Sequence, residues 1–241
     1  MKRILLNEVD STNSYAKSLR DVPDPDGEIT VIRAVRQRGG RGRNGKPFFS
    51  DHAGGLWASL VVPIADISAH FDHNRAVSLA IRAALLECMP SGDAPVSIKW
   101  PNDIYWGDRK IAGILLENIP QKPNALIIGF GINVNIAQDD FPRDLHKTTT
   151  SVLMEIGEEY VLDALLDRVL REYEFIIKRG PKGAHAVYVG NLYKKGCQAA
   201  VGPHAGTFVT VEADGRLRLD TAQGPMLLSS GTLRFPGEPI R

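Results

Sequence analysis

The densest group of residues able to do chemistry is the stretch 39–46, which reads Gly-Gly-Arg-Gly-Arg-Asn-Gly-Lys. Its four glycines leave the backbone amides accessible, and its three cations make it wholly positive. Glycine lets the backbone approach a ligand closely, and the arginine guanidinium is a planar fork of donors that matches phosphate oxygens. The stretch therefore indicates an anion-binding loop. A solvated basic loop is the ordinary interpretation of a lone Gly/Arg run, so other residues must decide.

A second set of reactive residue types stands at 99–103, which reads Lys-Trp-Pro-Asn-Asp. Pro101 forces an extended or turn geometry, so a cation, an aromatic ring, an amide and a carboxylate share one strand end. Pro-Asn-Asp is also good turn chemistry, and Trp100 is explained as well by burial in a core as by a site. The charged Lys99 and Asp103 beside an apolar strand favour a functional interpretation.

Four consecutive residues of helix-capping type, Asp10 to Asn13, follow a short apolar strand. The simplest interpretation is that they cap the helix that begins near Tyr15. The alternative is that the hydroxyls of Ser11 and Thr12, with the free amides of the helix start, bind a small polar group. This stretch alone favours capping.

Two phosphate-binding signatures are approached but not completed. Residues 40–46 fit G-x-x-x-x-G-K, yet Pro47 follows where a P-loop needs the hydroxyl that ligates magnesium. Gly129-Phe130-Gly131 begins a dinucleotide fingerprint, but Val134 takes the position of its last glycine. The sequence holds no H-E-x-x-H, no paired C-x-x-C and no G-x-S-x-G motif. Walker-type NTPases, Rossmann enzymes, zinc sites and serine hydrolases are therefore disfavoured.

The elements that must position these residues follow from apolar periodicity. Two strands, Ile29–Val35 and Leu56–Val62, flank the basic loop, so it joins strand to strand. Two helices are expected at about 72–89 and 158–178, where apolar residues recur at helical spacing. The other expected segments are a strand at Ile4–Val9, a loop at 21–27, a strand at Val96–Lys99, a hairpin from 104–106 and 110–117, and a strand at 125–134.

The composition changes near the C-terminus. From Cys197 onward, short β-type segments alternate with Gly, Pro or Asp-Gly. So many short, regularly spaced strands predict a small β-barrel of about fifty residues. We expect a domain boundary near Asn191, with the larger domain over 1–190 and the barrel over 191–241.

Composition and charge describe an ordinary globular protein. Of 241 residues, 43% are hydrophobic and 24% charged, and the formal net charge is +1. This near-neutral background gives no global attraction to nucleic acid or to an anionic membrane. Cys88 and Cys197 lack metal-ligand spacing and indicate reduced thiols. The N-terminus has no apolar run long enough for a signal peptide or a membrane span, so we expect a cytoplasmic protein.

Five motifs, taken in order, resemble those of the biotin protein ligases. They are Asp10–Asn13, Gln37 with Gly40–Gly45, Lys99–Asp103, Arg109–Leu115 and Gly129–Asn135. Gly215–Leu217 and Ser230–Arg234 are similar to the small SH3-like domain of that family. No helix-turn-helix segment precedes Ile4, so the resemblance is to the monofunctional type, which does not bind DNA.

The resemblance implies an ATP-dependent, AMP-forming ligase. With magnesium it would activate biotin to biotinyl-5′-AMP, then transfer biotin to a lysine of the biotin carboxyl carrier domain of a carboxylase. The implied fold is α+β, a mixed, largely antiparallel sheet with packed helices of the class II synthetase-like biotin/lipoate ligase type, plus a C-terminal SH3-like β-barrel. A homodimer is compatible with this fold, and the sequence does not identify metal ligands.

Residue by residue, the resemblance assigns one group of side chains to biotin. Ser11, Thr12 and Gln37 would bond the ureido ring. Lys110 would bridge the biotin carboxylate and the α-phosphate, where a fixed ammonium stabilises developing charge. The full biotin-binding set is Ser11, Thr12, Asn13, Gln37, Gly40, Arg41, Lys110 and Gly113.

A second group is assigned to the nucleotide and to the chemistry. The nucleotide set is Arg43, Lys46, Phe48, Lys99, Asn102 and Asn133, and the catalytic set is Lys110, Arg41, Arg43 and Asp103. Asp103 is a candidate to deprotonate the incoming lysine, whose ordinary pKa near ~10.4 keeps it mostly charged. Asn44 and Lys46 stand where many relatives carry arginine, and Phe48 stands where an aromatic residue packs over adenine.

Two rival functions stay open at this level. A lipoate or octanoate ligase or transferase of the same superfamily would activate its carboxylate in the same way as a biotin ligase does. Its ligand has no ureido ring, so the polar Ser11, Thr12 and Gln37 favour biotin. A nucleic-acid-binding module could use the Gly/Arg loop and an SH3-like tail, but near-zero net charge and a single basic cluster count against it.

Overall fold

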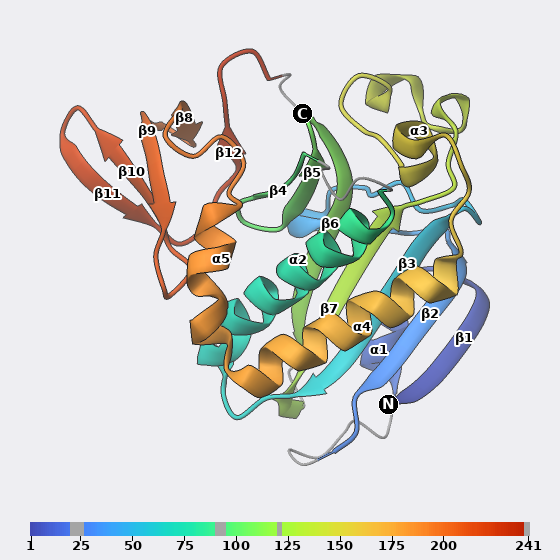
Figure 1. The fold of residues 1–241 in the computed structure, drawn as a ribbon. Coiled ribbons are helices and arrows are strands. Elements are labelled where there is room, and N and C mark those ends of the chain that lie inside the picture. Colours follow the sequence, from blue (N-terminus) through green and yellow to red (C-terminus); the bar gives the residue numbers. More distant parts are fainter. Residues whose placement is uncertain (20–26, 90–94, 120–121, 239–241) are drawn as a thin grey trace.

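The computed structural model describes residues 1–19, 27–89, 95–119 and 122–238. Its main feature is a seven-stranded sheet in the order β1-β2-β3-β7-β6-β5-β4 (Figure 1). The strands are β1 (Lys2–Val9), β2 (Thr30–Gln37), β3 (Gly55–Pro63), β4 (Val96–Lys99), β5 (Asp103–Trp106), β6 (Arg109–Ile119) and β7 (Lys122–Asn133). β1 pairs parallel with β2, and the other five neighbouring pairs are antiparallel. The predicted mixed, largely antiparallel sheet is confirmed.

Two long helices cover one face of this sheet, and a short helix covers the other. α2 (His70–Glu87) and α4 (Leu162–Arg179) lie side by side across the first face, and α1 (Thr12–Ser18) lies behind the sheet (Figure 1). Strand alternation explains the two layers. On β7, Ile128 and Phe130 belong to the core under α2 and α4, whereas Ile127 packs with Ala16 of α1. None of the described helices is long and apolar enough to cross a membrane.

The predicted helix at 158–178 starts later than expected, and a short helix precedes it. α3 (Val152–Ile156) is capped at its start by Ser151, whose Oγ accepts a hydrogen bond from the Met154 amide. Gly157, with φ 79°, caps its end. Asn135 then holds the next residues extended, because its side chain exchanges two 2.9 Å hydrogen bonds with the backbone of Tyr160. α4 therefore begins at Leu162. The predicted loop at 21–27 lies outside the described residues except for Gly27.

The predicted hairpin after Pro101 is present as β5 and β6, with Gly107 at φ 56° in the turn. Asp103 pairs with Gly113, and Tyr105 pairs with Lys110, so the register shifts by one residue between them. Such a bulge turns the following side chains to the other face of the strand. Here it brings Lys110 to the face that carries Asp103 and Gly113.

The C-terminal part forms a second, five-stranded antiparallel sheet in the order β11-β10-β9-β8-β12. Its strands are β8 (Gln198–Val201), β9 (His204–Val211), β10 (Leu217–Thr221), β11 (Gly224–Leu228) and β12 (Leu233–Arg234). The sheet follows α5 (His185–Gly190), a helix that the sequence did not predict. The strand pairings do not join β11 to β12, so closure into an SH3-like barrel remains a prediction.

The loop between β9 and β10 of this second sheet contacts the main body. Trp100 is buried and its indole nitrogen donates to the Gly215 carbonyl at 3.0 Å, which supports the core interpretation of this residue. Arg75 on α2 is fully buried, lies over the Phe71 ring at 4.7 Å, and donates to the Ala213 carbonyl at 2.8 Å. The loop between β9 and β10 is therefore fastened to α2 and to the start of the 100–103 turn.

Candidate active site

A cleft opens on the sheet between the start of α1 and the basic loop at 39–46. It lies where β2, β3, β6 and β7, together with Asn102 just before β5, bring glycines and polar side chains to one face of the sheet. Its lining consists of Ser11, Thr12, Asn13, Gln37, Arg41, Gly42, Phe48, Ala58, Asn102, Lys110, Gly113, Ile114, Leu115, Gly129, Phe130 and Gly131. Residues from all five motifs of the sequence analysis therefore meet in one place.

The basic loop is folded back on itself as a small hairpin. The Gly42 amide donates to the Lys46 carbonyl at 2.8 Å, and the Phe48 amide donates to the Gly40 carbonyl at 2.9 Å. Its tip has φ 56° at Asn44 and φ 70° at Gly45, the combination that Asn-Gly turns adopt easily. At Gly40 an added Cβ would lie 2.0 Å from Ser50 Oγ, so this position has no room for a side chain.

One end of the cleft carries neutral polar groups. Gln37 Oε1 accepts from the Thr12 amide at 2.7 Å and lies 3.0 Å from Thr12 Oγ1. Ser59 on β3 is fully buried, and its Oγ lies 2.7 Å from Thr12 Oγ1 and 2.6 Å from Asn13 Oδ1. Ser11 is also buried and lines the same end, but its side chain does not cap α1.

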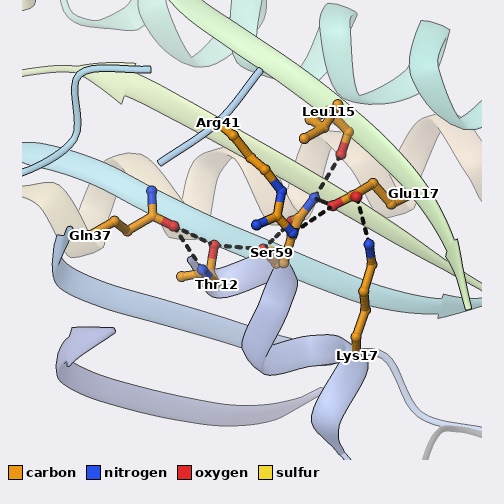
Figure 2. A network of polar contacts seen from close by, with 8 residues as sticks. Thr12, Lys17, Gln37, Arg41, Ser59, Leu115 and Glu117 are labelled. Carbon is orange, nitrogen blue, oxygen red and sulfur yellow. Dashed lines mark hydrogen bonds and ion pairs between the residues drawn. The ribbon is translucent and has the colours of Figure 1, made fainter. Parts of the chain in front are cut away.

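Behind this end lies a charged network that the sequence analysis missed (Figure 2). Asn13 Nδ2 donates to Glu117 Oε2 at 2.8 Å, Lys17 Nζ donates to Glu117 Oε1 at 2.6 Å, and Arg41 Nη2 lies 3.9 Å from Glu117 Oε2. A signal for Glu117 existed, because strand alternation places it on the same face of β6 as Gly113. Ser59 had a weaker one, as a hydroxyl inside an otherwise apolar strand.

Lys110 also lines the cleft. Its Nζ lies 2.6 Å from Asp103 Oδ1 and 5.5 Å from the centre of the Phe48 ring. Phe48 packs edge-on against Trp57, with 6.0 Å between the ring centres. The backbone of Lys110 is fixed on both sides, because its amide donates to the Thr148 carbonyl and its carbonyl accepts from the Thr150 amide, each at 2.9 Å.

The remaining predicted nucleotide residues differ in their placement. Asn102 lines the cleft and donates to the Ile114 carbonyl at 2.5 Å. Asn133 is buried beside the cleft and donates to the Thr150 carbonyl at 2.9 Å. Lys46 is exposed at the hairpin tip. Arg43 Nη1 donates to the Gly231 carbonyl at 3.1 Å, and burial lowers the pKa of Arg43 while the charge of Asp103 opposes that shift.

Lys99 lies away from the cleft lining. Its ammonium is held by both carboxylate oxygens of Glu238, at 2.7 and 2.8 Å, and faces the rings of Tyr105, Tyr193 and Phe235. Burial lowers the pKa of Lys99, and the partly compensating influence comes first from Glu238. The structure therefore engages this lysine with the C-terminal segment rather than with the predicted nucleotide residues.

The fold and the cleft define an α+β protein of the biotin protein ligase type. Among solved structures, a variant of biotin protein ligase from Aquifex aeolicus in complex with biotin aligns with TM-score 0.82 and 26% identity, over 98% of this chain and 99% of that one. The apo form of that enzyme aligns with TM-score 0.80 and 23% identity, over 98% and 99%. The chain belongs to the biotin/lipoate A/B protein ligase family, whose model matches residues 5–133.

Curated relatives agree with this family. The bifunctional ligase/repressor BirA of Bacillus spizizenii is 32% identical over 168 residues, which are 69% of this chain and 50% of that protein. Biotin--[acetyl-CoA-carboxylase] ligase of Paracoccus denitrificans is 37% identical over 135 residues, 55% of this chain and 54% of that protein. The chain thus spans about half the length of the curated relatives it matches.

Proposed function

We propose that this protein is an ATP-dependent biotin protein ligase. It joins biotin to AMP and then transfers biotin to a lysine of a biotin carboxyl carrier domain. The observation that carries the proposal is that one cleft is lined by neutral polar groups, Thr12 and Gln37, and by a cation, Lys110, that a carboxylate holds in place. The names of the relatives agree, because structures of that type contain biotin and ATP and one relative is named for acetyl-CoA-carboxylase.

In the first step, a biotin carboxylate oxygen attacks the α-phosphorus of ATP and pyrophosphate leaves. Two anions must meet, so the reaction needs positive charge that is already in place. Lys110 lines the cleft, and we assign it contacts with both the carboxylate and the phosphate. Arg41 lines the cleft, and Arg43 lies close enough to Asp103 for their charges to interact, so both can add positive charge without a rearrangement of the sheet.

In the second step, the lysine amine of the carrier attacks the biotinyl carbon of the mixed anhydride and AMP leaves. The amine must lose a proton to become a nucleophile and a further proton as the amide forms. Asp103 is the carboxylate that lies beside Lys110, at 2.6 Å, and we assign it the role of receiving a proton there. The Lys110 ammonium keeps Asp103 close to the point of attack.

The nucleotide is assigned to the cationic end of the cleft. Phe48 offers a ring for stacking, Asn102 and Asn133 offer amides, and Lys46 stands at the hairpin tip. We leave Lys99 out of this set because Glu238 occupies its ammonium. Among the described residues, no group of three or more His, Cys, Asp or Glu side chains could hold a metal ion. Magnesium would therefore be bound mainly by the phosphates of ATP, which is a common mode for this ion.

Further features from the sequence complete the proposal. We keep the division into 1–190 and 191–241, which fits the end of α5 at Gly190 and the start of β8 at Gln198. We propose a cytoplasmic location, as expected from the sequence, and cell fractionation tests it. A homodimer would use an open sheet edge such as β1, and a mass measurement in solution at several concentrations tests it.

The decisive experiment is ATP-dependent transfer of labelled biotin to a purified carboxyl carrier domain, with lipoate run alongside. We expect biotin transfer, pyrophosphate release and little reaction with lipoate. A stable adenylate with lipoate and none with biotin would reverse the choice of substrate. Salt-sensitive binding to DNA or RNA without pyrophosphate release would instead support a nucleic-acid-binding module.

A further inference from the structure

Glu117 lies behind the polar end of the cleft and does not itself line the cleft. Its carboxylate accepts from Asn13 at 2.8 Å and from Lys17 at 2.6 Å, and Arg41 lies 3.9 Å away (Figure 2). Burial would raise the pKa of Glu117, but the hydrogen bonds from Lys17 and Asn13, with the charges of Lys17 and Arg41, lower it below its ordinary value. An ionised carboxylate can only accept hydrogen bonds.

This carboxylate decides which way the Asn13 amide points. Asn13 Nδ2 faces Glu117 Oε2 and also the Leu115 carbonyl, at 3.2 Å, and neither group can donate. The nitrogen of the amide must therefore lie on that side. The amide oxygen then faces Ser59 Oγ at 2.6 Å, and it also packs against Gly129, where an added Cβ would approach it to 2.2 Å.

The orientation of Asn13 sets the direction of the hydroxyl hydrogens that follow. Ser59 has a single hydroxyl hydrogen and two near oxygens, Asn13 Oδ1 and Thr12 Oγ1. Because Asn13 Oδ1 can only accept, the hydrogen of Ser59 goes to it. The 2.7 Å contact between Ser59 and Thr12 is then favourable when the Thr12 hydroxyl donates to Ser59. The chain of donors runs from Thr12 through Ser59 and Asn13 to Glu117.

This direction leaves acceptors at the surface of the cleft. Gln37 Oε1 is an acceptor, because it already accepts from the Thr12 amide at 2.7 Å. The two hydroxyl hydrogens of Ser59 and Thr12 are shared among three oxygen contacts of 2.6, 2.7 and 3.0 Å. When the Thr12 hydroxyl donates to Ser59 and not to Gln37 Oε1, the longest contact is the one left without a hydrogen, and Thr12 Oγ1 presents lone pairs there. Two oxygens at this distance with no hydrogen between them are stabilised by a donor from the ligand. The ring nitrogens of a cyclic urea supply such an N–H group, and the dithiolane of lipoate does not.

We propose that Glu117 is a positioning residue that fixes this donor direction and so selects a ligand ring bearing N–H groups. The inference rests on the proposed function, since biotin is the ligand whose ring it concerns. It assigns the choice of ring partly to a side chain behind the wall of the cleft, not only to the residues that touch the ligand.

The test uses Glu117→Gln with Lys17→Met as its companion. In E117Q, Lys17 attracts the oxygen of the new side-chain amide, so the nitrogen of that amide faces the side-chain nitrogen of Asn13. The chain of hydrogen bonds from Thr12 then has no fixed direction. We expect the KM for biotin to rise about tenfold or more, the order of one misdirected buried hydrogen bond. The KM for ATP and the thermal midpoint should change little, because Glu117 does not line the cleft and its contact with Arg41 is long, at 3.9 Å.

Removal of Lys17 supplies the control. K17M alone keeps the carboxylate that orients Asn13, so its KM for biotin should stay within about twofold of the wild-type value. The double variant E117Q/K17M frees the glutamine oxygen to face Asn13 and should recover much of the lost affinity. That rescue would not follow if Glu117 merely stabilised the fold through its ion pair with Lys17.

The outcomes separate this inference from the proposed function. The inference is overturned if E117Q has the wild-type KM for biotin. It is also overturned if E117Q loses affinity for biotin and for ATP equally. Failure of the double variant to recover affinity also overturns it. If the wild-type protein shows no biotin-dependent pyrophosphate exchange and no biotin binding by calorimetry, the proposed function itself fails. A selective loss of affinity for biotin in E117Q, recovered in the double variant, supports both the inference and the proposed function.

Discussion

Lys110 Nζ lies 2.6 Å from Asp103 Oδ1, and both side chains remain partly exposed to the cleft. The bulge in β6 makes this contact possible, because it turns Lys110 onto the face that Asp103 shares. An entering anion therefore meets an ammonium that is already oriented by a carboxylate. The pair joins the group assigned to charge stabilisation with the group assigned to proton transfer.

Lys110→Ala should abolish biotin-dependent pyrophosphate exchange while the fold is retained. Loss of a fixed charge at a developing anion costs about a thousandfold in rate or more. Circular dichroism and the thermal midpoint should match the wild type, and Lys178→Ala, which removes an exposed lysine of α4, should leave exchange unchanged. Near-normal exchange in K110A would refute the proposed mechanism.

Asp103→Asn should separate the two steps. The amide keeps a polar partner beside Lys110 but cannot take a proton, so transfer to the carrier lysine should slow by about a hundredfold. Formation of the adenylate should fall by less than about tenfold, because this step needs no base. Single-turnover assays that follow adenylate and biotinylated carrier separately measure both, and an equal loss in the two steps would remove Asp103 from its role.

Gly129→Ala should block the polar end of the cleft. An added Cβ would lie 2.2 Å from Asn13 Oδ1, so the Asn13 amide or the strand must shift. Overpacking of this kind costs about 1–3 kcal/mol, and here the cost should appear as weaker biotin binding in calorimetry. Gly190→Ala is the matched control, since an added Cβ there meets nothing within 4 Å. Unchanged binding in G129A would show that Asn13 is not held where the structure has it.

Stability should fall below neutral pH because of His73. This residue of α2 is buried, its Nδ1 lies 2.7 Å from the hydroxyl of Tyr173 on α4, and burial lowers its pKa to about 4. The unfolded chain binds a proton near pH ~6.5 and the folded chain only near pH 4, so folding is favoured above that range and loses stability as the pH falls through it. Between pH ~8 and ~5 this amounts to about 2 kcal/mol. Urea unfolding of His73→Gln should show a smaller decrease, and equal decreases would contradict the assignment.

The surroundings of Lys99 predict a structural role. Glu238→Gln leaves a buried ammonium without its carboxylate, which typically costs about 3 kcal/mol or more. The double variant K99M/E238Q should regain much of that loss, because no buried charge remains. Thermal unfolding measures both. A KM for ATP that rises selectively in K99M would restore the nucleotide role predicted from the sequence.

The sheet, the hairpin and the second β segment could be predicted because their strands are apolar, regularly spaced and punctuated by glycine. The start of α4 could not, because it depends on hydrogen bonds from Asn135 to Tyr160. α3 and α5 were missed for a similar reason. Each is too short to form without packing or a cap, such as Ser151 before α3.

The cleft was predictable where motif and contact coincide. Thr12, Gln37, Arg41 and Lys110 were assigned from the sequence and lie together in the structure. Glu117 was missed because its partners are distant in the sequence, Asn13 by 104 residues and Lys17 by 100. Only the fold brings them together. The position of the Lys99 ammonium also depends on a residue that is distant in the sequence, Glu238.

The contact between Arg43 and the Gly231 carbonyl joins the basic hairpin to a loop of the second sheet, 188 residues further along the chain. A phosphate that attracts this guanidinium competes with that carbonyl. Thermodynamic reciprocity then requires that whatever displaces the loop tightens nucleotide binding, and that a bound nucleotide loosens the loop by the same free energy. A carrier domain that touches the second sheet would thus alter nucleotide affinity without entering the cleft.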